Sequence, residues 1–97
     1  MEVLQTPEIK RLYQTIAALQ TEEDCASFFE DICTIRELES ISQRLEVAKM
    51  LKDGLGYQEI SAKCGASTAT ISRVNKCLLY GGGGYNIVLG GKTEENE

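Results

Sequence analysis

Residues 57–78, YQEISAKCGASTATISRVNKCL, have the spacing of a helix-turn-helix. Apolar residues recur where two short helices would touch: Ile60, Cys64, Ala66, Ile71 and Val74. Ser61 is small at the expected crossing, and Gly65 lies where the chain must turn. Two such helices meet at a steep angle, and the second presents its outer face to a DNA major groove. The alternative is an ordinary pair of core helices joined by a glycine turn.

The expected outer face of the second helix is small, polar or basic, which suits contact with bases and phosphates. Its members are Ser67, Thr68, Ala69, Thr70, Ser72, Arg73 and Lys76. Gln58 and Lys63 of the first helix complete the expected DNA-binding set. The expected partner is therefore a double-stranded DNA operator.

The charge distribution agrees with this placement, although the net charge of −5 does not favour a polyanion. Residues 1–34 carry seven acidic and two basic side chains, whereas residues 55–80 carry three basic side chains against Glu59 alone. Local charge governs phosphate contacts more than the total does. The basic excess is small, and a dimer would double it.

Length and composition indicate one domain of residues 1–97, with a helical core over 6–80 and a glycine-rich turn and flexible tail over 81–97. The chain is 42% apolar and 26% charged, which is typical of a globular fold. No apolar run approaches the roughly 20 residues of a membrane span, and the first ten residues do not resemble a signal peptide. We expect a cytoplasmic protein without a membrane partner.

The residue types argue against an enzyme or a metal site. The chain has no histidine, and none of its four cysteines forms a C-x-x-C pair, which excludes most zinc sites. There is no nucleophile elbow and no carboxylate pair that can be placed across a cleft. Cys64 and Cys77 are expected to be small buried side chains, and all thiols are expected to be reduced.

Upstream of the helix-turn-helix, capping residues predict three helices. Thr6-Pro7-Glu8 and Thr21-Glu22-Glu23-Asp24 are helix starts, and Thr34 with Glu37 forms a capping box. The capping box opens a helix over about 35–53, and the motif helices are expected over 57–63 and 67–79. The long helix has a wide apolar surface, which suggests burial on more than one side: Leu38, Ile41, Leu45, Val47, Ala48, Met50 and Leu51. The fold class is all-α.

The run Gly81–Gly84 predicts a hinge or turn, because each glycine in a helix costs about 1 kcal/mol relative to alanine. A phosphate-binding loop is rejected, because no strand is expected before the run. Gly91-Lys92-Thr93 superficially resembles the end of such a loop, but it lies in a polar tail with no helix expected after it. Tyr80 and Tyr85 flank the run, and we expect them to pack the following segment back on the core.

With these residues in place, the chain resembles the tryptophan repressor family, and within it the uncharacterised YerC/YecD-type branch. The resemblance covers about residues 7–79 and is densest over 51–78, where GASTATISR at 65–73 parallels the family's turn and recognition helix. The ending over 80–89 resembles that of the uncharacterised branch. The resemblance implies an intertwined, all-helical homodimer, with the N-terminal and central helices packed against those of the partner.

The resemblance also implies where an effector would bind. In the family, two arginines sandwich an indole, and a glycine in the recognition helix makes room. Arg73 matches one arginine, the other falls on Gln43 or, with one gap, on Arg44, and the glycine position is Val74. A β-branched side chain there would fill the place of the ring. We therefore expect no tryptophan corepressor and no other cofactor, while a different small-molecule effector stays open.

The expected function is a sequence-specific, repressor-like transcriptional regulator that binds DNA as a homodimer. The alternative is a helical dimeric protein-interaction module that has lost DNA binding, which the acidic N-terminal region would suit.

Overall fold

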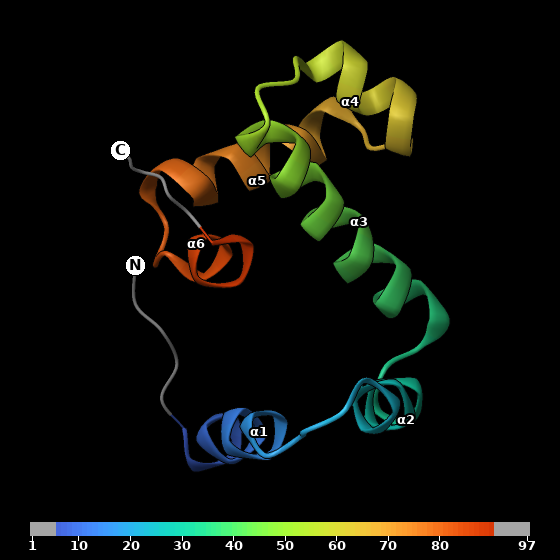
Figure 1. The fold of residues 1–97 in the computed structure, drawn as a ribbon, viewed down its shortest axis with the longest axis vertical. Helices are drawn as coiled ribbons and strands as arrows, with labels where there is room; N and C mark the ends of the chain where they lie inside the picture. Colours follow the sequence, from blue (N-terminus) through green and yellow to red (C-terminus); the bar gives the residue numbers. More distant parts are fainter. Residues whose placement is uncertain (1–5, 91–97) are drawn as a thin grey trace. The chain divides into compact units, whose positions relative to one another are not determined.

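The computed structural model describes residues 6–90, which form six α-helices and, within that range, no strand (Figure 1). This confirms the all-α prediction. The chain divides into two compact units, Met1–Leu38 and Glu39–Glu97. The expectation of a single domain over 1–97 stays a prediction.

The first unit contains α1 (Pro7–Ala17), α2 (Glu22–Ile32) and the start of α3 (Ile35–Lys52). Each of the predicted helix starts is confirmed by a side-chain cap. The Thr6 hydroxyl accepts a hydrogen bond from the amide of Ile9 at 3.1 Å, and the Thr21 hydroxyl accepts one from the amide of Asp24 at 3.0 Å. These bonds satisfy amides that have no partner within the helix.

The capping box at the start of α3 is reciprocal, as predicted. The Glu37 amide donates to the Thr34 hydroxyl at 3.1 Å, and the Thr34 amide donates to the Glu37 carboxylate at 2.8 Å. Although these helices have good caps, the first unit buries few side chains. Neither α1 nor α2 has a buried residue. Ile35 remains 77% exposed.

The second unit continues α3 and adds α4 (Tyr57–Cys64), α5 (Thr68–Tyr80) and α6 (Gly84–Leu89). Its core consists of side chains that are at most 1% exposed: Val47, Ala48, Ile60, Ala66, Ile71 and Val74. Three helices and the turn between α4 and α5 contribute to this cluster. The helix-turn-helix is therefore built on the C-terminal half of α3.

The end of α3 is a Schellman motif at Gly54, whose φ of 91° suits a residue without a Cβ. The Leu55 amide donates to the Met50 carbonyl at 3.1 Å, and the Gly54 amide donates to the Leu51 carbonyl at 3.0 Å. Leu55, Met50 and Leu51 all pack against the core cluster. The turn thus closes α3 and directs the chain into α4.

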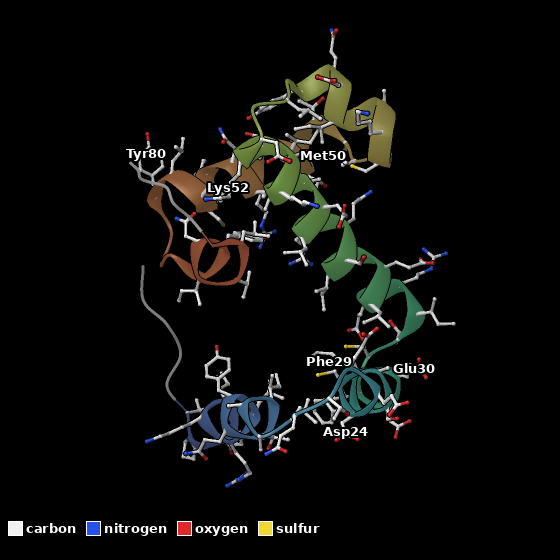
Figure 2. The ribbon with its side chains drawn as sticks, viewed as in Figure 1. Asp24, Phe29, Glu30, Met50, Lys52 and Tyr80 are labelled. Atoms are coloured by element: carbon white, nitrogen blue, oxygen red, sulfur yellow. The ribbon has the colours of Figure 1, made fainter. Side chains whose placement is uncertain are left out.

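The C-terminal segment differs from its prediction. Residues 81–83 form the expected turn, but a short helix, α6, follows within the segment assigned to a turn and tail. Tyr85 packs against the core as expected, whereas the expectation for Tyr80 is wrong, because that side chain is 81% exposed at the end of α5 (Figure 2). The remainder of the expected flexible tail, 91–97, lies outside the described residues.

The cysteines are all free, and one of them is placed differently from its prediction. Cys64 packs against the core, but Cys77 is exposed at the edge of the outer half of α5, next to half-buried Thr70 around the helix axis. Among residues 6–90, no helix is both long and apolar enough to cross a membrane. Over the same range, no group of three metal-ligating side chains is present.

Candidate DNA-binding site

The turn between α4 and α5 has the geometry that the sequence predicts. Gly65 ends α4 in the left-handed region, with a φ of 74°, and its amide donates to the Ser61 carbonyl at 2.8 Å. Ala66 is 1% exposed and fills the space beneath the turn. Ser67 then caps α5, since its hydroxyl accepts from the Thr70 amide at 3.1 Å. Three consecutive residues thus set the angle between the two helices.

The circumference of α5 is divided into two halves, as follows from about 100° of rotation per residue. One half is buried or half-buried: Thr70, Ile71, Val74, Asn75 and Leu78. The other half is exposed: Thr68, Ala69, Ser72, Arg73, Lys76, Cys77, Leu79 and Tyr80. Five of the predicted site residues on α5 therefore share one exposed surface.

This exposed surface is small and basic near the start of α5. The first two turns contribute hydroxyl and methyl groups, and Arg73 and Lys76 follow within one turn of each other. The helix carries no acidic residue along its length. Such a surface admits close approach to a groove and offers two cations to phosphates.

Thr70 differs from the other predicted site residues on α5. It is half-buried, and its hydroxyl oxygen accepts a hydrogen bond from the Ser67 hydroxyl at 3.1 Å. Ser67 therefore uses its only hydroxyl hydrogen inside the cap and retains only acceptor capacity for a ligand. The Thr70 hydroxyl keeps its own hydrogen, at the edge of the buried half.

The two predicted residues of α4 are both exposed but do not share a face. Gln58 lies in the first turn and Lys63 in the last turn. Five positions separate them, which corresponds to about 140° around the helix axis. A single groove or phosphate row would therefore meet them from different sides.

The candidate effector residues do not share one environment. Gln43 is half-buried, and its side-chain amide donates to the Cys64 carbonyl at 3.2 Å, which ties α3 to the last turn of α4. Arg44 is exposed and donates to the Ser40 hydroxyl at 3.1 Å. Arg73 is exposed on the outer half of α5, whereas Val74 is 1% exposed within the core.

Two apolar residues on the exposed half of α5 were not included in the sequence-based site. Leu79 is 63% exposed and Tyr80 is 81% exposed. By helical rotation, Tyr80 lies between Ala69 and Arg73 around the axis, two to three turns further along. A helical projection of residues 68–80 would have found both of them, because it needs only the sequence.

Comparison with known proteins gives concordant matches. The family model described as "Trp repressor protein" matches residues 7–93, so the match continues through the glycine-rich segment. The uncharacterized protein YerC of Bacillus subtilis (strain 168) is 47% identical over 89 residues, which cover 92% of this chain and 86% of YerC.

Two crystal structures are similar in both fold and sequence. A candidate Trp repressor from Staphylococcus aureus matches with a TM-score of 0.85 and 44% identity, covering 89% of this chain and 86% of the other. A TrpR-like protein from Eubacterium eligens ATCC 27750 matches with a TM-score of 0.85 and 50% identity, covering 89% of each chain. On this evidence, the chain belongs to the Trp repressor family.

Proposed function

We propose that this protein is a sequence-specific DNA-binding transcriptional regulator, rather than an enzyme, that acts as a homodimer through α4 and α5. The observation that carries the proposal is the division of α5. Its buried half holds Ile71 and Val74 in the core, and its opposite half exposes Thr68, Arg73 and Lys76 without any acidic residue. Membership of the Trp repressor family supports the same function.

The dimer is supported by apolar surface that the single chain leaves uncovered. Large apolar side chains from α1 to α3 remain at least partly exposed: Leu12, Tyr13, Ile32, Ile35, Ile41 and Leu45. A chain of this size buries only about 60–65% of its unfolded surface, so a second copy would add much of the missing burial. Two copies also double the basic surface of α5.

A symmetric dimer has a defined expectation for its DNA site. Two recognition helices about 34 Å apart enter successive major grooves on one side of the duplex. Footprinting should therefore protect two half-sites about 10 base pairs apart, centre to centre. Protection of a single asymmetric site would contradict the symmetric arrangement.

The decisive experiment is selection of bound DNA from a random pool at low salt, with and without amino acids. We expect one near-palindromic sequence to be enriched. Lys76→Ala should then weaken binding to all sequences and make the salt slope shallower by about one unit. Thr68→Ala should instead change the preferred sequence, since an exposed first-turn side chain faces base edges.

Lys10→Ala is the matched control, because it removes the same charge from α1. It should bind the selected site like the parent protein. If the parent enriches no sequence, the DNA-binding proposal is wrong. The alternative, a dimeric protein-interaction module, then becomes the better interpretation, and the net charge of −5 would suit a basic protein partner.

A further inference from the structure

The C-terminal helix α6 is attached to two other helices of its unit. Tyr85 and Leu89 lie one helical turn apart and pack against the core cluster that Val47 of α3 and Val74 of α5 help to form. Ile87 and Val88 on its other side are 80% and 69% exposed. Within residues 6–90, therefore, one side of α6 packs against the core and the other side stays exposed.

A polar contact adds to this packing. Lys52, the last residue of α3 (Figure 2), donates from Nζ to Oδ1 of Asn86 at 2.6 Å. The two residues are 34 positions apart in the sequence. Together with the apolar contacts, this bond attaches α6 to the last residue of α3 and to the core cluster.

The turn that brings α6 back depends on two of the four glycines. Gly81 ends α5 with its amide bonded to the Cys77 carbonyl at 2.9 Å, and a Cβ there would lie 2.5 Å from that carbonyl oxygen. Gly83 has a φ of 86°, in the left-handed region. A Cβ added at Gly82 or Gly84 would meet open space, and neither of these two residues has a positive φ.

We propose that α6, turned back by Gly81 and Gly83, holds α5 on α3, and that DNA binding requires this attachment although α6 itself does not contact DNA. The inference rests on the proposed function of α5. Physically, the C-terminal end of α5 would be free without the segment from Gly81 to Leu89. The contacts of that segment with α3 and the core cluster hold this end in place. A recognition helix that is held for only part of the time binds with an affinity reduced by that fraction.

The first test needs no DNA. Amide hydrogen exchange of α5 is measured in four variants: Gly81→Ala, Gly83→Ala, Gly82→Ala and Gly84→Ala. We expect exchange in the last two turns of α5 to accelerate about fivefold to thirtyfold in Gly83→Ala, as follows from the cost of a left-handed alanine. Gly81→Ala should accelerate it at least as much, while the Gly82 and Gly84 variants should match the parent.

The second test measures affinity for the selected DNA site by fluorescence anisotropy. Gly81→Ala and Gly83→Ala should bind about tenfold more weakly if α5 is attached in only a tenth of the molecules. Asn86→Ala should weaken binding by at most about fivefold, because the Lys52 contact is exposed. Asn86→Asp, which restores an acceptor for Lys52, should recover the parent affinity.

The outcomes separate this inference from the proposed function. If all four glycine variants exchange alike, α6 does not hold α5, and the inference is overturned. If exchange shows α5 detached in most molecules of a variant but the DNA affinity stays at the parent value, the positioning role is overturned. If the parent binds no DNA, the proposed function fails, and with it the claim that DNA binding requires α6. Hydrogen exchange then decides the remaining claim, that α6 holds α5.

Discussion

The two units of this chain bury their apolar residues in different ways. The helix-turn-helix unit encloses Ile60, Ile71 and Val74 at no more than 1% exposure. The α1 and α2 helices have equally good caps and yet bury no residue. Good local sequence signals are therefore not sufficient for a core. The helices α1 and α2 of the first unit leave their apolar side chains at least partly exposed, whereas the second unit has a core of its own.

The largest expected effect concerns the uncovered apolar surface. The parent should sediment as a dimer at low micromolar concentration. Leu45→Glu should convert it to a monomer, because a carboxylate buried without a partner costs about 3–5 kcal/mol. Glu46→Lys, a charge change at an exposed position about 100° around α3 from Leu45, is the control and should remain dimeric. A well-folded parent monomer would refute the dimer and leave the exposed residues of α1 to α3 unexplained.

The next effect compares one isoleucine from each unit. Ile71→Ala should lower the free energy of unfolding by about 2–5 kcal/mol, since it opens a cavity in the core. Ile35 is 77% exposed in the single chain, so Ile35→Ala should cost less than about 0.5 kcal/mol in a monomer. Urea denaturation measures both. A loss well above that bound for Ile35→Ala would place that residue under a partner chain.

A smaller effect is expected from the helix caps, which are alike in the two units. Thr21→Ala and Ser67→Ala should each cost about 1 kcal/mol of stability, because each leaves a helix amide without its acceptor. Thr21→Ser, which keeps the hydroxyl, should be nearly neutral. Thermal unfolding followed by circular dichroism provides the measurement. A much larger loss for Thr21→Ala than for Ser67→Ala would mean that the cap also supports contacts between helices.

The smallest expected effect is that of tryptophan, which should leave the protein unchanged. Val74 is part of the core, and inserting extra atoms beside it would cost about 1–3 kcal/mol of overpacking. Gln43 is engaged with the Cys64 carbonyl. Calorimetric titration with tryptophan should therefore give no binding heat, and Val74→Gly should not create binding. Micromolar affinity would show that the core of the second unit opens for a ligand.

Local signals predicted most of the helix boundaries. The caps Thr6, Thr21, Thr34 and Ser67 act on amides three residues away, so the sequence contains both partners of each bond. The turn at Gly65 was predictable for the same reason. The exposure of five of the predicted site residues on α5 follows from helical rotation, whereas contact with DNA stays a prediction.

Long-range contacts account for what the sequence did not predict. Helix α6 has only six residues, which is too short to be stable without packing. Its support comes from packing against the core cluster and from Lys52, 34 positions before Asn86 in the sequence. The sequence also does not distinguish the four consecutive glycines. Among them, only Gly81 lacks space for a Cβ, and only Gly83 has a positive φ. The prediction for Cys77 was wrong because this residue lies at the boundary between the buried and exposed halves of α5, where helical rotation alone does not decide burial.

The division of α5 has a consequence for how such a protein can change during evolution or in a designed library. Substitutions at exposed positions such as Thr68, Ala69 and Ser72 leave the core intact, and surface changes of this kind usually alter stability by less than about 0.5 kcal/mol. Substitutions at buried positions such as Ile71 and Val74 disturb the core and lower the stability. Under the proposed function, new target sequences can therefore arise from substitutions on the exposed side of α5, while the residues on its buried side keep the fold unchanged.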